Sequence, residues 1–584
     1  MMRWRLVATQ APRDETGLAP ELKATPGTFV GKRRQWFTST KGASVGAKPS
    51  PKPASPKPKL GLRHWMNSVL EECDRANDGF DVDAVHDLRV ALRRCLSLAD
   101  GLRAIDPDSS WKEMKKNGKK LFQALGDLRD MQVMQEWIEK LSDGKARTAD
   151  PAGDTSSDDR FSSDPAATRL FDHAQHREAE CKQHGFKVLN QFDRKQWRQW
   201  SRTLPRRAAR VRPGSAVYLH LALEKWTAAY ELHKHAMRTR SQVALHQLRI
   251  GIKRFRYTVE NFLPQLHAEW GHDLKELQDL LGEVHDLDVL WATAIDHSVN
   301  AFPDVESRRR WREKLTAERT KRIARYREKM VGRQSLWHVW RAELPSGPRL
   351  RAAALSRLRT WAGYLDPDFS HSQRVAQLAL LLYDGLNHAH LLTPQSAPLN
   401  SEDPRTVLQA AAFMHDVGKA QAEENHHKNS YRMIRKLPRP LGWTARELEL
   451  AAVVARYHRG ALPRPSGKAM QTLDLPDRHQ AMQSAGILRL ANALDKRPST
   501  SASEKSPRLE VIPIEAGVST RSGVVVRVAG YSALDHSAET VAAARHLLET
   551  MLRRSILVRP LRTSAARPAR AQVARKSTRS SQAA

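Results

Sequence analysis

Histidine and aspartate residues recur in five short motifs between residues 366 and 495. The motifs are DPDFSHSQRVA (366–376), AAFMHDVGK (411–419), HHKNSY (426–431), ARYHR (455–459) and ILRLANALD (487–495). Imidazole and carboxylate ligands that come singly from several helices suit a divalent-metal site. A metal with open positions lowers the pKa of a water molecule for hydrolysis. The motifs therefore indicate metal-assisted hydrolysis in this part of the chain.

A row of cations lies along the segment 246–257 (HQLRIGIKRFRY). At about 100° per residue, a helix here gathers into one sector, roughly 80° wide, the side chains of His246, Arg249, Lys253 and Arg256. The neighbouring sector is apolar and suits a core: Leu245, Leu248, Ile252, Phe255 and Val259. Like charges stacked in this way repel by roughly 0.2–0.5 kcal/mol per close pair. Such a face needs either solvent or a polyanion, and a solvated face stays open for a single row.

The same pattern occurs 160 residues earlier, counted from position 86 to position 246. Residues 83–94 read DAVHDLRVALRR, with cations at His86, Arg89 and Arg93. A second matched pair follows at an offset of 156: LFQALGDLRDMQV (121–133) and LQDLLGEVHDLDV (277–289). Two matches in the same order indicate an internal duplication. The unit is too long for a solenoid repeat, so we predict two pseudo-symmetric helical bundles.

The duplicated H-x-x-R-x-x-x-[RK]-R helices, each followed by L-x-x-x-L-G-x-x-x-D, resemble the CHAD (conserved histidine α-helical) domain over residues 61–345. The resemblance implies two antiparallel bundles around a basic channel that binds inorganic polyphosphate. Arginine offers bidentate contacts to phosphate, lysine a point charge and histidine a pH-dependent donor. The expected polyphosphate ligands are His86, Arg89, Arg93, Arg94, Lys115, Lys116, Lys119, His246, Arg249, Lys253, Arg254 and Arg256.

The composition also favours an anionic partner. The chain has 584 residues, with 97 lysines and arginines against 64 aspartates and glutamates, and a net charge of +33. Nucleic acid, anionic lipid and a phosphate polymer all fit that charge. The cationic helices carry few aromatic residues for base stacking, so we favour polyphosphate over nucleic acid. No apolar run approaches the roughly 18 residues of a membrane span. The three cysteines lack CxxC spacing, so we expect a reducing cytoplasm, with association to polyphosphate granules.

The His-Asp motifs resemble the HD-domain metal-dependent phosphohydrolases, with their order H…HD…H…H…D. The resemblance implies a core ligand set of His371, His415, Asp416 and Asp495. His427 and His458 match the histidines that support a second metal, with His426 as the alternative to His427. One or two divalent ions, such as Mg²⁺ or Mn²⁺, would bind there. We expect catalytic roles for Asp416 and Lys419, and Arg374 is a second candidate cation facing phosphate, although a surface role is equally open for each cation.

Three of these motifs look like the C-terminal HD-like region of the exopolyphosphatase/guanosine-pentaphosphate phosphatase family. They are HHKxSY, ARYHRGALP and LRLAxALD, and Asn492 stands where aspartate is common. The glycine-rich phosphate loops of that family's actin-like catalytic domain are not found. Two hypotheses follow. The protein hydrolyses polyphosphate or a phosphorylated nucleotide, or it is a non-catalytic polyphosphate-binding protein with a degenerate HD module.

The expected fold is mainly α: a duplicated helical bundle, an all-α HD-type domain and a small α+β tail. Residues 1–60 are Pro/Lys-rich and predicted to be disordered. The CHAD-like region 61–345 would consist of repeats at 61–140 and 169–345, separated by a flexible acidic insert at 141–168. The HD-type domain is placed at 350–500 and the tail, with two strands and a helix, at 505–558. Residues 560–584 form a basic tail that we also expect to be disordered.

Overall fold

The computed structural model describes residues 61–142, 161, 164–392, 403–495, 507–514, 522–532 and 537–561. Within these residues the chain is mainly α with one small mixed sheet, as the sequence predicted. The expectations for residues 1–60 and for the C-terminal tail after 561 lie outside the described residues, as does most of the acidic insert. No helix in the described ranges is long and apolar enough to cross a membrane.

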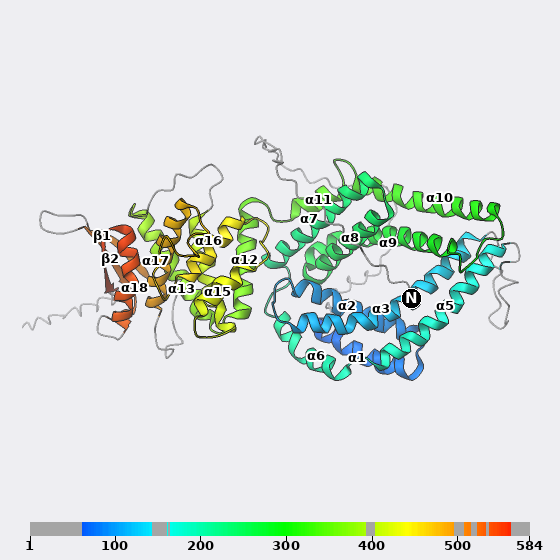
Figure 1. Ribbon diagram of the computed structural model, residues 1–584, viewed down its shortest axis with the longest axis horizontal. Helices are drawn as coiled ribbons and strands as arrows, with labels where there is room; N and C mark the ends of the chain where they lie inside the picture. The colour runs from blue at the N-terminus through cyan, green and yellow to red at the C-terminus, as the bar shows by residue number, and fades with distance from the viewer. Residues whose placement is uncertain are drawn as a thin grey trace, which may run out of the picture. The chain divides into compact units, whose positions relative to one another are not determined.

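The N-terminal module is built from two groups of helices, which form two layers (Figure 1). The first group is α1 (Leu62–Gly79), α2 (Val82–Leu102), α3 (Ser110–Leu141), α5 (Pro165–Asn190) and α6 (Arg194–Ala208). The second group is α7 (Ala216–Thr239), α8 (Gln242–Phe262), α9 (Pro264–Ala294), α10 (Val305–Met330) and α11 (Leu336–Glu343). The layers meet where α2 packs against α8 and α3 against α9.

The duplication is visible in the helix bounds. α2 and α8 each have 21 residues, and both their first and last residues differ by 160. Each begins at a side-chain cap: Asp81 accepts a hydrogen bond from the Ala84 amide, and Ser241 from the Ala244 amide. The predicted apolar stripes are buried, since Leu88 and Leu248 are both fully enclosed in one shared core. The cationic side chains therefore lie beside that core.

The bounds of the two halves differ from the predicted repeats. α5 begins at Pro165, inside the segment 141–168 that we expected to separate the halves. α5 packs on α3 and α6 packs on α1, so both belong to the first half, which runs to Ala208. The insert thus interrupts a pair of packed helices and does not divide the repeats. The sequence pattern missed this because the matched motifs cover only α2, α3, α8 and α9.

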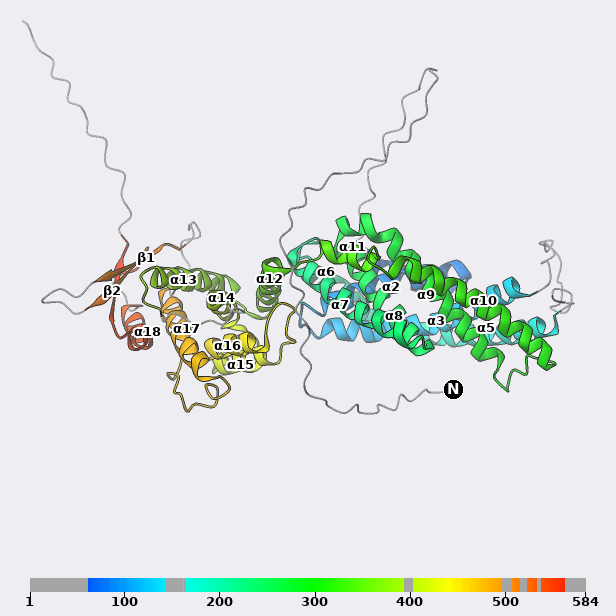
Figure 2. The same ribbon diagram turned by 90° about the horizontal axis from the view of Figure 1, so that it is seen from above.

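The C-terminal module consists of helices followed by a three-stranded sheet. Its helices are α12 (Gly347–Leu365), α13 (Phe369–His388), α14 (Pro404–Met414), η1 (Val417–Ala420), α15 (His426–Arg435), α16 (Ala445–Arg456), α17 (Leu475–Leu494) and α18 (Ser537–Leu552). In Figure 2, α13 and α14 lie on one side of the module and α15 and α16 on the other. This arrangement brings the ends of α14, α16 and α17 and the start of α15 towards one another.

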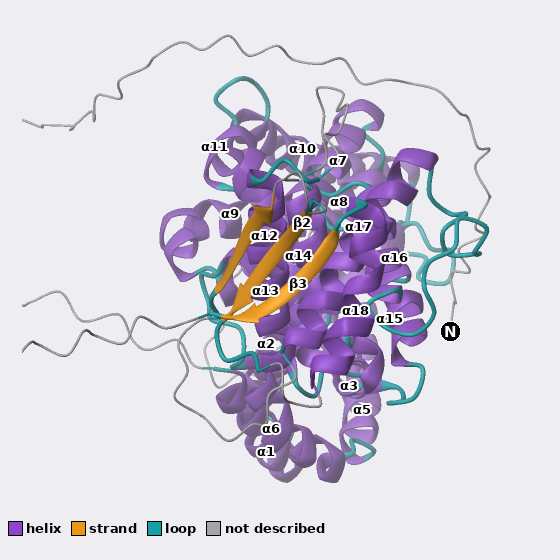
Figure 3. Ribbon diagram, turned by 90° about the vertical axis from the view of Figure 1, so that its left-hand side faces the viewer, coloured by secondary structure: helices purple, strands orange, loops and turns teal. Residues whose placement is uncertain are grey.

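The sheet packs on these helices and is not separate from them. Figure 3 shows the sheet in front of the helices. Its strands are β1 (Leu509–Ile514), β2 (Gly523–Val528) and β3 (Ser555–Pro560). β1 pairs with β2 antiparallel, and β2 pairs with β3 parallel. The sequence predicted the first two strands and the following helix, but not β3. Buried valines of β2 share one apolar core with α13 and α17, so the expected boundary between domain and tail is not a boundary of the core.

Candidate metal centre and cationic groove

Asp416 lies at the centre of a buried histidine cluster. α14 ends at Met414, and the chain then turns through His415 and Asp416 into η1. The Asp416 Oδ1 atom is 3.1 Å from the Nε2 atom of His426 and 3.5 Å from that of His458. Its Oδ2 atom is 3.5 Å from His415 Nε2 and 4.0 Å from His371 Nε2. Asp416 therefore joins two groups of potential ligands: one with His371 and His415, and one with His426 and His458.

Backbone carbonyls set the protonation of three of these imidazoles. The Nδ1 atoms of His415, His426 and His458 lie 2.7, 2.8 and 2.8 Å from the carbonyl oxygens of Ala412, Glu423 and Ala455 respectively. Each Nδ1 must donate to its carbonyl, so in the neutral form of each ring the Nε2 atom keeps its lone pair. Burial lowers the pKa of both His415 and His458, which favours the neutral form that binds metals.

In these neutral forms, no donor among the described residues satisfies the three Nε2 lone pairs. The buried Nε2 atom of His415 has no hydrogen-bond partner. The Nε2 atoms of His426 and His458 face each other at 3.3 Å, although both are acceptors in these tautomers. A cation between them and the Asp416 carboxylate would remove that repulsion, and nitrogen and carboxylate oxygen are ligands of divalent metals. The residues present therefore fit a metal centre.

The structure places His426, rather than His427, in the cluster. α15 begins at His426, directly after Asn425, whose φ of 55° is in the left-handed region. The first helical residue thus faces Asp416, and the next one is rotated by about 100°. The His427 ring centre lies 6.4 Å from that of His458, and His427 belongs to neither ligand group. The sequence offered both histidines because it did not determine where the helix starts.

Asp495 contacts a ligand instead of converging with the others. Its Oδ2 atom is 2.7 Å from His371 Nδ1, and its Oδ1 atom accepts a hydrogen bond from Arg374 Nε at 2.9 Å. Asn492 Oδ1 lies 2.9 Å from the His371 Nε2 atom that would face a metal. In this arrangement Asp495 orients His371, and its role as a direct ligand stays a prediction. Arg374 is tied to Asp495, whereas Lys419 Nζ lies 2.6 Å from Asp416 Oδ2.

The cluster opens into a pocket of about 390 Å³. Lys419 and Arg459 bring positive charge to its wall, and α18 closes one side with Thr540, Ala543 and Ala544. Arg489 donates to the carbonyl oxygens of Tyr457 and Gly460, at 3.1 and 3.0 Å, and so holds the turn that carries His458. The sequence gave no role to Arg489 or to α18. Arg489 was visible in the motif 487–495, but nothing in the sequence indicated that α18 returns to this pocket.

The cations of α2 and α8 face one another in the N-terminal module. Burial lowers the pKa of Lys253 to about 8, and the charges of Arg249, Arg93 and Arg89 act in the same direction. Two of these neighbours come from α2, so cations of both halves lie close together. We call the residues His86, Arg89, Arg93, His246, Arg249 and Lys253 the cationic groove. Sequence reasoning assigned all six to polyphosphate and the structure brings Arg89, Arg93, Arg249 and Lys253 together.

Two carboxylates also enter the cationic groove, Asp130 from α3 and Asp286 from α9. Burial raises the pKa of both, that of Asp286 to about 6. Arg249 opposes this shift at each carboxylate, and Asp130 reinforces it at Asp286. They occupy the final position of the two L-x-x-x-L-G-x-x-x-D motifs, to which the sequence gave no binding role. The cationic groove thus contains internal anions that partly neutralise it.

Two regions of the chain match known protein families. Residues 62–294 match the CHAD domain, and residues 354–515 match the Ppx/GppA phosphatase, domain III, which is HD-like. The chain combines a CHAD domain with a Ppx/GppA phosphatase domain III. No curated protein matches the chain. The CHAD match ends with α9, although α10 packs on α9 and α11 on α7. The match to domain III ends just after β1, so α18 and the other strands lie beyond it.

The other predicted cations of the CHAD domain differ in their partners. Arg94 forms an ion pair with Glu260, and Arg256 Nη2 lies 3.6 Å from the same carboxylate. Lys115 pairs with Asp100. No ion pair is recorded among the described residues for three of the predicted ligands: Lys116, Lys119 and Arg254. Of the twelve predicted ligands, Arg94, Lys115 and Arg256 therefore have carboxylates that already balance them.

Gly418 provides a test of the metal centre, because it allows η1 to approach α15. A Cβ atom at this position would lie 2.1 Å from the His426 carbonyl oxygen and 2.6 Å from the Ser430 amide nitrogen. We expect Gly418→Ala to displace α15, lower the free energy of unfolding by about 1–3 kcal/mol and weaken Mn²⁺ binding in calorimetry. The control is Gly282→Ala in α9, where a Cβ meets nothing within 4 Å. Unchanged Mn²⁺ affinity in Gly418→Ala would contradict the assignment of His426.

Proposed function

We propose that this protein binds inorganic polyphosphate through its CHAD domain and hydrolyses a phosphate ester or anhydride in its HD-like domain. The substrate would be polyphosphate itself or a phosphorylated nucleotide. The observation that carries the hydrolytic part is the convergence of imidazole lone pairs on Asp416 beneath a positively charged pocket. A set of unsatisfied nitrogen acceptors around one buried carboxylate is unfavourable without a cation.

The residues of the pocket suit phosphate chemistry. One or two divalent ions such as Mg²⁺ or Mn²⁺, held by Asp416 and the histidines, would supply Lewis acidity and an activated water. Lys419 pairs with Asp416 and lies on the wall of the pocket, where its ammonium group would face a phosphate oxygen of a bound substrate. Arg459 lies on the same wall and would neutralise further charge on the leaving group.

CHAD domains are associated with polyphosphate, and the cationic groove supports the same ligand here. Three arginines and a lysine from opposing helices match a chain of closely spaced charges better than a single phosphate. Of the aromatic rings of α8, Phe255 and Phe262 are buried in the core. Tyr257 is half-buried and lies against Lys253 and Arg256, so α8 offers few stacking surfaces to a base. Polyphosphate is therefore preferred to nucleic acid, and association with polyphosphate granules in the cytoplasm would follow from this binding.

A second candidate function is polyphosphate binding with an idle HD-like domain. It is favoured by the partners of Asp495, because its hydrogen bonds to His371 and Arg374 hold it away from Asp416. The contact of Asn492 Oδ1 with His371 Nε2 also favours an idle domain, because a metal ligated by His371 would need that nitrogen. The two functions differ in whether Asp416 is required for phosphate release.

Replacing Asp416 separates the two functions. We expect Asp416→Ala to lose bound metal and to release phosphate from polyphosphate or guanosine nucleotides at least about a hundredfold more slowly, because Asp416 joins both ligand groups. Metal content is measured by atomic emission and phosphate by a colorimetric assay, with Mg²⁺ or Mn²⁺ present. Asp384→Ala, which breaks an ion pair with Arg405, is the control. Absence of metal and equal rates in all three proteins would favour the idle domain.

Replacing Arg249 tests the cationic groove. We expect Arg249→Ala to weaken polyphosphate binding by about tenfold or more, since a charge-assisted contact to phosphate contributes roughly 1.5–3 kcal/mol. Arg309→Ala in α10, an exposed residue paired with Glu306, should leave affinity unchanged. The measurement is calorimetry at about 150 mM salt, because nonspecific phosphate contacts fade at that ionic strength. Equally tight binding of duplex DNA under these conditions would contradict the preference for polyphosphate.

The pH dependence of binding follows from Asp286 and Lys253. Polyphosphate favours neutral Asp286 and charged Lys253, so affinity should fall as pH rises through about 6 and again through about 8. Titrations with long chains at constant ionic strength, from pH 5.5 to 9, measure both steps. Asp286→Asn should remove the lower step and Lys253→Arg the upper one. An unchanged profile in both variants would exclude these two groups as its source.

A further inference from the structure

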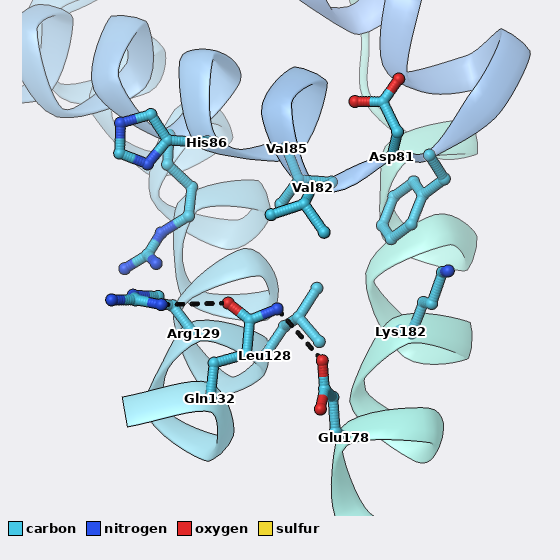
Figure 4. Close-up of a pocket in the computed structure, with 11 residues that line it drawn as sticks. Asp81, Val82, Val85, His86, Leu128, Arg129, Gln132, Glu178 and Lys182 are labelled. Atoms are coloured by element: carbon cyan, nitrogen blue, oxygen red, sulfur yellow. Dashed lines mark hydrogen bonds between the residues drawn. The ribbon is translucent and has the colours of Figure 1, made fainter. Parts of the chain in front are cut away.

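A small pocket lies at the N-terminal end of α2, between α2, α3 and α5. Its cationic side chains are His86 and Arg89 of α2, Arg129 of α3 and Lys182 of α5. Figure 4 shows His86, Arg129 and Lys182 around this space, with Val82, Val85 and Leu128 as apolar lining. The volume of about 90 Å³ suits one tetrahedral anion and is too small for a nucleobase with its sugar. The pocket continues the cationic groove, because His86 and Arg89 belong to both.

One buried cation of this pocket has a donor that nothing satisfies. The Nε atom of Arg89 is buried and has no hydrogen-bond partner. Burial lowers the pKa of Arg89, and the charges of Arg93 and Arg129 add to that effect. Arg129 has one carboxylate partner, Glu136 at 2.9 Å. No ion pair is recorded for Lys182 in the described part of the chain. Adjacent guanidinium groups with an unsatisfied donor are a site for a multiply charged oxyanion.

Two carboxylates line the same pocket, on the side of Lys182 (Figure 4). They are Asp81, the cap of α2, and Glu178 of α5. Glu178 accepts hydrogen bonds from Gln132 at 3.1 Å and from Gln135 at 2.7 Å, which stabilise its negative charge. Figure 4 shows Gln132 between Arg129 and Glu178. A polyanion that extends past Arg129 would therefore meet negative charge. Repulsion by these carboxylates favours a polyphosphate chain that ends at this pocket.

Two lysines of α3 lie near the opposite end of α2. α3 runs antiparallel to α2, since Leu96 near the end of α2 contacts Gly118, whereas Arg89 near its start lies over Phe122. Lys116 and Lys119 thus lie at the end of α2 away from the pocket. The second half does not repeat the pocket's charge. The position that matches Arg129 is His285, whose Nδ1 atom lies 3.3 Å from that of His246.

We propose that this pocket binds the terminal phosphate of a linear polyphosphate chain and that Arg129 and Lys182 are its additional ligands. The inference rests on the proposed binding of polyphosphate. A terminal phosphate carries a second ionisable oxygen, with a pKa near 6 in phosphate monoesters, whereas an internal phosphate carries one charge. Paired guanidinium groups and an ammonium group match that extra charge and its additional acceptors. The chain would enter with its end at Arg129 and extend along α2 towards Lys116 and Lys119.

The test compares two polyphosphate probes of equal length by calorimetry. One probe has free ends, and the other has both terminal phosphates blocked as phosphoramidates of a bulky amine. The wild-type protein should bind the free-ended probe about tenfold more tightly. Lys182→Ala and Arg129→Gln should each weaken binding of the free-ended probe by about five- to tenfold and change binding of the blocked probe by less than about twofold. Arg177→Ala, an exposed α5 residue paired with Glu180, is the matched control.

The outcomes separate this inference from the function on which it rests. Equal affinity of the wild-type protein for both probes, or equal losses on both probes in Lys182→Ala, would overturn terminal recognition. Arg249→Ala should weaken both probes alike, because Arg249 belongs to the cationic groove and does not line the pocket. If Arg249→Ala changes neither probe, the proposed binding groove itself fails. Lys182 is exposed and unpaired, so its replacement leaves folding intact, which a thermal unfolding curve verifies.

Discussion

Burying the apolar faces of α2 and α8 in one core forces their cationic faces into a common groove. Leu88, Leu92, Leu248 and Ile252 are completely enclosed, so neither helix can rotate its charges away without exposing them. Each of these leucines or isoleucines contributes roughly 1.5–3 kcal/mol by leaving water. That exceeds the repulsion of a few tenths to about 1 kcal/mol between partly solvated cations. Apolar packing therefore determines how α2 and α8 are oriented, and the cations stay side by side despite their repulsion.

The cost of burying these charges appears in the pKa values of Lys253 and Asp286. Lys253 loses affinity for its proton, and Asp286 gains affinity for its own, because burial penalises both charged forms. Asp130 and Asp286 offset part of the repulsion, yet no described ion pair joins them to Arg249 or Lys253. The groove is thus held together by its core and remains under electrostatic strain. An anion that displaces water there would relieve it.

In the HD-like domain, packing brings together hydrogen-bond acceptors, whereas in the CHAD domain it brings together cations. Its buried histidines are fixed by backbone carbonyls three residues earlier, so their acceptor nitrogens cannot turn towards solvent or towards one another's protons. The packing of these helices places acceptor nitrogens around Asp416, just as the packing of α2 and α8 places cations side by side. In both sites the fold fixes polar groups that lack a partner of opposite charge. Such groups are typical of ion-binding sites, here for a cation at Asp416 and for an anion at the cationic groove.

The sequence predicted the features that depend on periodicity and order. A period of 3.6 residues identified the buried and cationic faces of α2 and α8, and the repeated motifs revealed the duplication. Features that depend on one residue or on distant packing were not accessible. Whether His426 or His427 faces Asp416 depends on where α15 begins, and a shift of one residue rotates the side chain by about 100°. α5 and α6 repeat no motif, and α18 reaches the pocket through its packing on α17, where Gly486 lies against the backbone of Leu548.

The differences between the two halves give the groove a direction. A strictly symmetric duplication would bind a linear polyanion equally in both orientations. Here Arg129 in the first half is matched by His285, a residue with far less charge at neutral pH because burial lowers its pKa to about 4. The lysines at the start of α3 have Lys275 as their counterpart in α9, and that residue pairs with Asp279. The repeat kept the helices that make the core and the central cations, while the flanking charges diverged. Since the shared apolar core and central contacts such as the Arg94–Glu260 ion pair hold the two halves together, the flanking charges could change without loss of the fold, and the asymmetry they create can orient a bound polyphosphate chain.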